Sequence, residues 1–408
     1  MTVLIAGAGI GGLTLALSLH QIGVPCRVFE SVGELRPLGV GINVQPHAIK
    51  ELDRLGLLPA LDSAGLRTAG LGYFAKHGAE IWREPRGTAA GYRWPQFSIH
   101  RGHLQMLLFD AAMERLGPES IRLGAGVAGW QAADDGVEIT LESGDTEQGC
   151  IFVAADGIHS AARAALYPDE GLPLWNRVLM WRGTTWAPDF LGGRTMAMVG
   201  SKPHKFVCYP IIEDGNRVLI NWICDRMFPE DHEWAREDWN RQGSADDLLP
   251  HYKDWRFEWL DVPAIINGAD AIYEWPMVDR DPLPKWTHGP MTLLGDAAHP
   301  MYPIGSNGAS QAILDARVLA REIKDNGATP VAMQTYEGDR RPKTSAIVLA
   351  NRGDGPDVVL DIVQDRAPNG FSRLDDVISQ AELEEIAARY KATAGMDVET
   401  LNSAPPIL

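Results

Sequence analysis

The stretch VLIAGAGIGGLTLALSLHQIG, residues 3–23, decides the fold class of this chain. It predicts a short buried strand, a glycine-rich turn and then an apolar helix. In the turn, Gly7 would permit a tight bend, Gly9 would let the backbone approach a pyrophosphate, and Gly12 would let helix and strand pack closely. The next predicted strand, CRVFE, ends in Glu30, where a carboxylate can bind the hydroxyls of a ribose. The stretch therefore predicts an α/β, Rossmann-like unit that binds a dinucleotide.

A second match to the same glycine pattern, GAGVAG at residues 124–129, shows how little the pattern means alone. The residues that follow it, WQAADDGVEITL, alternate between polar and apolar side chains around an Asp-Asp-Gly turn. That alternation predicts a β-hairpin, so these glycines are expected in a strand or a bulge. Only the first match combines a strand, a helix and an acidic residue at the proper distance.

Length, charge and cysteine content limit the possible functions. The 408 residues suit two or three interleaved domains, and a hydrophobic content of 45% predicts a globular enzyme. The net charge of −17 and the lack of a Lys/Arg run argue against a nucleic-acid partner. The four cysteines are widely spaced and form no CxxC pair, which predicts neither disulfides nor a metal site and favours a reducing, cytoplasmic location.

The apolar N-terminal stretch predicts neither a signal peptide nor a membrane span. It lacks a basic segment before its apolar residues, its first positive charge is Arg27, and glycines interrupt it. No later segment is a better candidate for a span, so we expect a protein without a membrane partner.

A second glycine-rich helix entrance, GDAAHPMYPIGSNGASQAILDA at residues 295–316, follows the apolar strand MTLL. Asp296 stands at the carboxyl end of that strand, where parallel sheets bind ligands and where a carboxylate can accept a ribityl hydroxyl. A helix that starts at residues 307–310 would present backbone N–H groups to the negative charge that develops on a reduced flavin ring. A dinucleotide with a sugar-alcohol bridge needs both helix entrances, so the two loops together predict FAD.

Between the two entrances lies ADGIHSAAR, residues 155–163. It follows the predicted strand CIFVA, so Asp156 would also stand at the carboxyl end of a strand. Two interpretations are open here. Asp156 helps to hold the cofactor, or Asp156 and Gly157 form only a turn that Ser160 caps.

These three motifs, in this order and spacing, resemble those of the group A flavin-dependent aromatic hydroxylases, the p-hydroxybenzoate hydroxylase class. Further stretches resemble the phenazine-1-carboxylate hydroxylases within that class: RPLGVGINVQP, FSIHRGHLQM, MWRG and PMVDRDPLPKW. The likeness extends over about residues 1–350. It implies that NADH or NADPH reduces bound FAD, and that O2 then forms a flavin C4a-hydroperoxide that hydroxylates an aromatic ring.

The resemblance also implies roles for individual residues around the cofactor. Arg101 would reach the FAD phosphates or ribose, and Arg36 would lie along the cofactor, although both could be ordinary surface or helix-capping arginines. Gly41 and Ile42 would border the flavin ring, and Asp156 would help to hold the pyrophosphate or the nicotinamide cofactor. The complete predicted cofactor set is Gly7, Gly9, Gly12, Glu30, Arg36, Gly41, Ile42, Arg101, Val127, Asp156, Gly295, Asp296, Pro303, Gly305, Asn307 and Gly308.

The substrate is expected to lie on a second, tryptophan-rich sheet. Ten of the thirteen tryptophans fall between Trp175 and Trp286, in a region of alternating predicted strands. Such a sheet can floor an apolar pocket for a planar aromatic molecule, although each of these residues could equally fill a second core. The predicted lining residues are Trp181, Tyr209, Trp222 and Met277.

The sequence contains no compact nucleophile or acid–base motif, which suits chemistry that a cofactor carries. No catalytic residue is therefore assigned, and the candidates are Arg182, Tyr209 and Pro303. Arg182 would bind a substrate carboxylate or stabilise the flavin, with a structural salt bridge as the alternative.

The predicted architecture is an FAD-binding domain interleaved with a β-sheet substrate domain and followed by C-terminal helices. The FAD-binding domain would comprise residues 1–72, 97–174 and 276–340, the substrate domain residues 73–96 and 175–275, and the helical segment residues 341–408. In the helical segment Ser379 is expected to cap a helix, and the segment would cover the pocket or make a dimer contact.

Several functional hypotheses are open at this point. The leading one is an FAD-dependent monooxygenase, monomeric or homodimeric, for an aromatic substrate that is phenazine-like and bears a carboxylate. A simpler benzoate, salicylate or hydroxypyridine acid is the alternative substrate. A plain NAD(P)-dependent dehydrogenase, which the loop at Gly295 and Asp296 opposes, and a non-catalytic nucleotide-binding protein on the same fold are the alternatives of other kinds.

Overall fold

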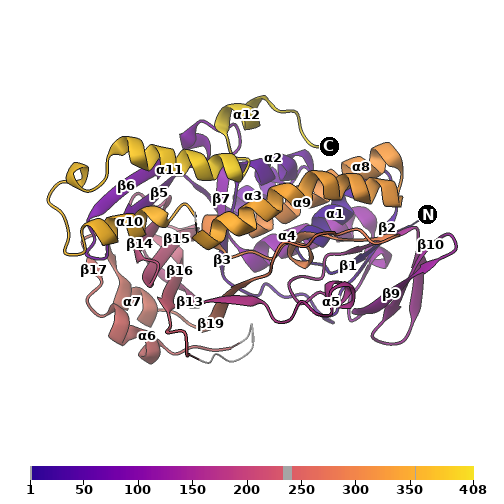
Figure 1. Ribbon diagram of the computed structural model, residues 1–408, viewed down its shortest axis with the longest axis horizontal. Helices are drawn as coiled ribbons and strands as arrows, with labels where there is room; N and C mark the ends of the chain where they lie inside the picture. Colours follow the sequence, from indigo (N-terminus) through magenta and orange to yellow (C-terminus); the bar gives the residue numbers. More distant parts are fainter. Residues whose placement is uncertain (1, 233–240, 354) are drawn as a thin grey trace.

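A computed structural model describes residues 2–232, 241–353 and 355–408, and Figure 1 shows their arrangement. A five-stranded sheet with the strand order β20-β12-β1-β2-β8 is parallel at every pairing. Its strands are β1 (Val3–Ala6), β2 (Cys26–Phe29), β8 (Ile121–Arg122), β12 (Ile151–Ala154) and β20 (Met291–Leu293). Every residue of β1 is buried, as expected for a central strand that is apolar on both faces.

Helices pack around this parallel sheet. They are α1 (Ile10–Gln21), α2 (Pro46–Arg54), α3 (Leu58–Ala64), α4 (Arg101–Leu116), α5 (Ala161–Leu166), α8 (Gly308–Asn326) and α9 (Pro330–Gly353). Helix α1 contacts both α4 and α8, and α8 contacts α9. Because α1 is apolar almost all round, with Leu13, Leu15, Leu17 and Leu19 buried, it needs this cover on several sides. The predicted Rossmann-like unit is confirmed.

A mixed seven-stranded sheet with the strand order β19-β13-β16-β15-β14-β5-β6 forms the second large layer. Its strands are β5 (Gly70–Phe74), β6 (Glu80–Pro85), β13 (Leu174–Pro188), β14 (Thr195–Ser201), β15 (His204–Asp214), β16 (Arg217–Met227) and β19 (Ile272–Asp279). The predicted domain boundaries at 72/73 and 275/276 fall inside β5 and β19, whose hydrogen bonds join both strands to this sheet along most of their length.

Three small sheets complete the fold. Their strands are β3 (Gly41–Val44), β7 (Gln96–His100) and β4 (Gly65–Thr68) in the first, β11 (Thr146–Gly149), β10 (Gly136–Leu141) and β9 (Val127–Ala133) in the second, and β17 (Arg256–Phe257) and β18 (Leu260–Asp261) in the third. Strands β9 and β10 pair as an antiparallel hairpin, so the second glycine pattern leads into a hairpin as predicted.

Helices cover both faces of the seven-stranded sheet (Figure 1). On one face lie α6 (Ala245–Tyr252) and α7 (Val262–Asn267), and on the other α10 (Val358–Arg366) and α11 (Gln380–Thr393). The short helix α12 (Val398–Ser403) follows, and Ser379 caps α11 through the backbone N–H of Glu382, as predicted. Within the described ranges, no helix has the length and apolar character to cross a bilayer, and no group of metal-ligating side chains gathers.

Candidate active site

The turn between β1 and α1 is built on the three predicted glycines. Gly7 has a φ of +96°, and a Cβ added there would lie 2.5 Å from the carbonyl oxygen of Ala155. A Cβ on Gly12 would overlap the carbonyl oxygen of Gly7. At Gly9, by contrast, an added Cβ would meet no protein atom within 4 Å, and this residue lines a cavity. The turn thus has the tight bend, the close packing and the open backbone that the sequence predicts.

The loop from β20 to α8 forms the second helix entrance. The N–H of Gly295 donates to Oδ2 of Asp315 over 3.2 Å, and Nε2 of His299 lies 2.5 Å from the same oxygen. Oδ1 of Asp315 accepts a hydrogen bond from Nε of Arg340 at 2.7 Å, so one buried carboxylate fastens the loop to α8 and α9. The carboxylate of Asp296, three residues after β20, stays open to the cavity.

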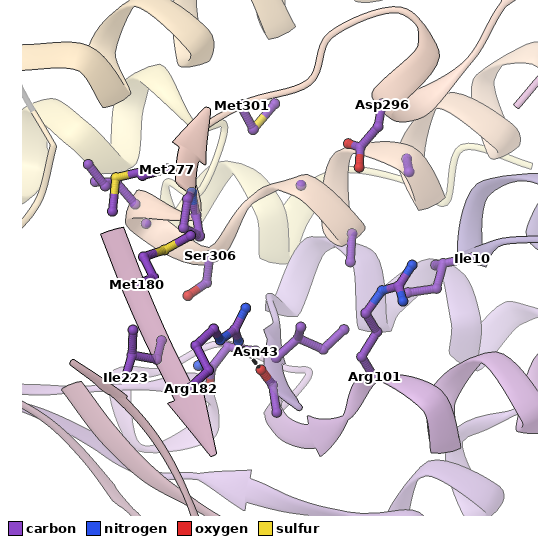
Figure 2. A pocket seen from close by; sticks show the side chains of 18 of the residues that line it. Ile10, Asn43, Arg101, Met180, Arg182, Ile223, Met277, Asp296, Met301 and Ser306 are labelled. Carbon is purple, nitrogen blue, oxygen red and sulfur yellow. Dashed lines mark hydrogen bonds between the residues drawn. The ribbon is translucent and has the colours of Figure 1, made fainter. Parts of the chain in front are cut away.

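One cavity of about 310 Å³ connects the two helix entrances with the seven-stranded sheet. Figure 2 shows its cofactor end, marked by Ile10, Arg101 and Asp296, and its sheet end, marked by Met180 and Met277. The cofactor end is polar and meets the N-termini of α1 and α8. The sheet end is lined mostly by methionine and branched aliphatic side chains, which suits a planar apolar ring.

The predicted site residues divide into two groups by their relation to this cavity. Those that line it are Gly9, Gly41, Ile42, Arg101, Arg182, Tyr209, Met277, Gly295, Asp296, Pro303, Gly305 and Gly308. Those that do not are Gly7, Gly12, Glu30, Arg36, Val127, Asp156, Asn307, Trp181 and Trp222. Some members of the second group form hydrogen bonds that hold nearby loops and helix ends in place, and others lie away from the cavity.

Three of the supporting residues act through hydrogen bonds. Oε2 of Glu30 accepts from the backbone N–H of Ala8 at 2.7 Å, which ties the end of β2 to the first glycine turn. Asn307 is fully buried, and its amide donates to the hydroxyl of Tyr390 at 2.8 Å. Oδ2 of Asp156 accepts from the N–H of Ala161 at 3.1 Å, and Ser160 is the N-cap of α5, as the second of the two interpretations expects. The first interpretation, a role for Asp156 in holding the cofactor, stays a prediction.

Arg36 and Val127 lie away from the cavity lining, so their contact with FAD stays a prediction. Arg36 pairs with Glu34 at 2.6 Å, and 67% of its side chain is exposed. Val127 is the first residue of β9 and pairs with Leu141 in the small hairpin sheet.

The prediction that Trp181 and Trp222 line the substrate pocket is wrong. Both are buried in the core that the sheet forms with α6 and α7, and Nε1 of Trp222 donates to Thr185 Oγ1 at 3.0 Å. Successive strand residues point to opposite faces, so their neighbours Arg182 and Ile223 line the cavity instead. Two further members of the predicted tryptophan cluster, at positions 234 and 239, lie outside the described residues.

Three side chains of the seven-stranded sheet fix the peptide groups of Gly41, at the middle of the cavity. The N–H of Gly41 donates to Oδ1 of Asn221 at 2.7 Å. Its carbonyl oxygen accepts from the Tyr209 hydroxyl at 2.7 Å and from Nη2 of Arg182 at 2.7 Å. Burial raises the pKa of Tyr209 to about 12, so at neutral pH this phenol is a hydrogen-bond donor to Gly41 and not a base.

Several cavity residues on the seven-stranded sheet were not predicted. They are Met180, Met196, Met198, Lys205, Val207, Ile223 and Asp225. Asn43 on β3 was not predicted either. Strand alternation was the available signal, because Lys205, Val207 and Tyr209 succeed one another at every second position of β15, as Ile223 and Asp225 do on β16.

The cofactor end of the cavity fits the FAD that the sequence predicts. Gly9 leaves the backbone at the start of α1 open, and two helices begin at the cavity wall, an arrangement that favours anionic groups. Arg101 and Asp296 face the space between these helix ends, where they offer one cation and one carboxylate to the phosphates and the sugar chain (Figure 2).

Comparisons with known proteins agree with this site. The family described as "FAD binding domain" matches residues 1–350. The chain is 45% identical over 403 residues to phenazine 1,6-dicarboxylic acid hydroxylase PhzS of Lysobacter antibioticus, covering 96% of each chain. It is 30% identical to 3-hydroxybenzoate 6-hydroxylase 1 of Aquipseudomonas alcaligenes, covering 86% of this chain and 87% of the relative.

Among solved structures, HpxO of Klebsiella pneumoniae in complex with FAD and uric acid has the same fold, with a TM-score of 0.76 and 23% identity over 99% of this chain and 97% of that one. The sequence matches, the FAD-complexed neighbours and the fitting cavity make FAD the cofactor, with NADH or NADPH as reductant and O2 as co-substrate. This chain therefore belongs to the FAD-binding domain family and, within it, to the flavin-dependent aromatic hydroxylases.

Proposed function

We propose that this monooxygenase hydroxylates a planar, phenazine-like aromatic carboxylate at the sheet end of the cavity. One observation carries the proposal: Arg182 lines the cavity, and its Nε is buried without a hydrogen-bond partner among the described residues. A buried donor on a permanent cation calls for an anionic acceptor. The apolar side chains around it call for a flat ring, and the relative at 45% identity is named for a phenazine acid.

The residues of the chain would position the ring and exclude water. Arg182 keeps Nη2 on the carbonyl oxygen of Gly41 and offers Nε to the substrate carboxylate. The N-terminus of α8, with Pro303 and Gly305 before it, would hold the cofactor ring opposite. The bound FAD supplies the chemistry that activates O2 for transfer to the ring. Met180, Met196 and other buried side chains keep water from the reacting atoms.

Consumption of NADH or NADPH in air by the FAD-loaded protein tests this function. Phenazine-1-carboxylate, salicylate, 3-hydroxybenzoate and 6-hydroxynicotinate would be added in turn, and each product analysed by mass. Stimulated consumption with one added oxygen atom supports hydroxylation and identifies the substrate class. Stimulation without a hydroxylated product, or the absence of any stimulation, would contradict the proposal for that acid.

Replacing Arg182 with methionine is expected to weaken binding of the preferred aromatic acid about 10- to 100-fold, because the carboxylate loses a charged hydrogen-bond donor. Ligand titrations that follow the flavin absorbance would measure the change. The carboxamide analogue of the same acid serves as the control, since its affinity should change much less. Equal losses for acid and amide would show that Arg182 only supports Gly41.

Tyr390 of α11 is expected to stabilise the cofactor loop. Its hydroxyl accepts from Asn307 at 2.8 Å and donates to Oδ1 of Asn351 at 2.9 Å. Tyr390→Phe removes the donor to Oδ1 of Asn351 and leaves the Asn307 amide nitrogen only its longer bond to the carbonyl of Gly305. We therefore expect a loss of about 1–3 kcal/mol of stability and faster release of FAD. Flavin fluorescence would measure the release rate.

Tyr92→Phe is the matched control for Tyr390→Phe. The Tyr92 hydroxyl donates to the carbonyl of Met396 in the C-terminal segment, whereas the Tyr390 hydroxyl bonds to Asn307 in the cofactor loop. Equal effects of the two substitutions on the rate of FAD release would show that the Tyr390 hydroxyl has no special role in stabilising the cofactor loop.

We further propose a reducing, cytoplasmic location and a monomeric or homodimeric state. All four cysteines are buried and unpaired, as expected for a chain that folds without disulfides. Sedimentation analysis of the FAD-loaded protein would determine the oligomeric state.

A further inference from the structure

The sheet wall of the cavity consists of cross-strand rows of different chemistry. The row beside Gly41 holds Tyr209 and Asn221, which pair across β15 and β16. The next row along the strands pairs Val207 with Ile223. The third row pairs Lys205 with Asp225, and four residues separate it from the first, roughly 13 Å at about 3.3 Å per residue.

The third row is a buried ionic cluster. Nζ of Lys205 lies 2.5 Å from Oδ2 of Asp357 and 3.4 Å from Oδ2 of Asp225, and the side chain of Lys205 is only 7% exposed. All three residues line the main cavity and also a second cavity of about 50 Å³ beside α10. The cluster is therefore a wall of the cavity and not part of a sealed core.

Asp225 has one oxygen without a partner. Its residue is 3% exposed, and Oδ1 is buried without a hydrogen-bond partner among the described residues. A buried acceptor left unpaired is unfavourable unless a ligand donor meets it. The cluster also contains two carboxylates and one ammonium group, so a ligand anion would meet more negative than positive charge.

We propose that Lys205, Asp225 and Asp357 form a recognition subsite in which Asp225 accepts a hydrogen bond from a hydroxyl, amino or ring N–H group of the substrate. The inference rests on the proposed function, which places the substrate carboxylate at Arg182, one row nearer to Gly41. The two unpartnered polar atoms, a donor at Arg182 and an acceptor at Asp225, then select an aromatic monocarboxylate with a second, donating substituent. A second carboxylate is disfavoured at the subsite.

Binding of three related acids to the FAD-loaded protein tests the subsite. The probes are phenazine-1-carboxylate, its 6-hydroxy derivative and phenazine-1,6-dicarboxylate, titrated against the flavin absorbance. The affinity for the hydroxy acid is expected to be higher than for either of the other two acids by a factor of about ten or more, because it alone offers a donor to Asp225. Tighter binding of the dicarboxylate would overturn the proposal and show that Lys205 leaves its carboxylates for the ligand.

Asp225→Asn is expected to abolish or reverse this preference. Lysine has only donors, so the amide oxygen would turn to Lys205 and the amide NH2 group would face the ligand. Asp361→Asn is the control, because this carboxylate lines only the smaller cavity and accepts from the N–H of Lys202 at 2.6 Å. An unchanged preference in Asp225→Asn would contradict the subsite, and the wild-type comparison does not depend on the variant's folding.

The same samples separate failure of the subsite from failure of the proposed function. If the acids bind and stimulate NADH or NADPH consumption but the hydroxy acid has no advantage, only the subsite is wrong. If none of the acids perturbs the flavin or stimulates consumption, the proposed function fails and the subsite inference fails with it.

Discussion

Replacing Asp315 with alanine is expected to destabilise the folded protein by about 3–5 kcal/mol, as removal of one partner from a buried ion pair does. Asp315 is fully buried and holds Arg340, His299 and the N–H of Gly295 together. Without it, the buried guanidinium of Arg340 keeps a hydrogen bond to Gln311 but loses its counter-charge. Urea unfolding of the FAD-free protein would measure the loss.

Asp339→Ala on α9 is the matched control for Asp315→Ala. Asp339 pairs with Lys343 on the helix surface, where an ion pair contributes about 0–1 kcal/mol. If the two substitutions lowered the unfolding free energy equally, the buried carboxylate would not be the fastening point of the cofactor loop.

The effect of Asp315→Ala is expected to depend on pH. Burial alone would raise the pKa of Asp315, but the nearby charges of His299 and Arg340 outweigh burial and lower the pKa. A carboxyl with a lowered pKa stabilises the fold at pH values above its unfolded pKa of about 4. This stabilisation is lost as the pH falls through the folded value. The difference in urea midpoint between wild type and Asp315→Ala should therefore shrink on going from pH 7 toward pH 3.

Substitutions of Gly9 and Gly12 by alanine are expected to separate FAD binding from folding. A methyl group on Gly9 meets no protein atom, so the FAD-free protein should unfold at the same urea concentration as the wild type. The same methyl group would occupy the place where the pyrophosphate approaches the backbone. We expect the Kd for FAD to rise about tenfold or more, which fluorescence titration would measure.

Gly12→Ala, unlike Gly9→Ala, should destabilise the FAD-free protein itself. Its methyl group overlaps the carbonyl oxygen of Gly7, so the turn must move and the FAD-free protein should lose about 1–3 kcal/mol of stability. Normal FAD binding by Gly9→Ala would show that the pyrophosphate does not lie at this turn.

The glycine turns could be predicted because their requirements are local. Gly7 is required by its φ of +96°, and Gly12 by its contact with the carbonyl of Gly7 in the same continuous stretch. The close approach of Ala155 to Gly7 comes from a distant part of the chain and was not predicted. The second entrance at Gly295 is also local, because strand, loop and helix follow one another directly. The fold class followed from these two stretches.

The substrate wall could be predicted only in part. Tyr209 and Met277 line the cavity, whereas Trp181 and Trp222 were selected for their aromatic rings and lie on the opposite face. Alternation along β13 and β16 places Trp181 and Trp222 on the face opposite to Arg182 and Ile223. Both faces of this sheet are apolar, however, so hydrophobicity alone could not show which face lines the cavity.

The ionic subsite could not be predicted from spacing. Lys205 and Asp225 meet through strand pairing, and Asp357 comes from the start of α10 more than a hundred residues later in the chain. No short motif contains all three residues. Their proximity depends on the C-terminal helices lying against the sheet, which the sequence predicted only as a possible cover.

The position of β20 in the parallel sheet has a consequence for folding during synthesis on the ribosome. The other four strands are complete by Ala154, but β20 and the covering helices α8 and α9 emerge only after about 290 residues have been made. Until then, β12 presents a free edge and α1 an apolar surface to other nascent chains. Abundant FAD in the cell therefore cannot hasten the early stages of folding, because the loop from β20 to α8 that lines the cavity has not yet been translated.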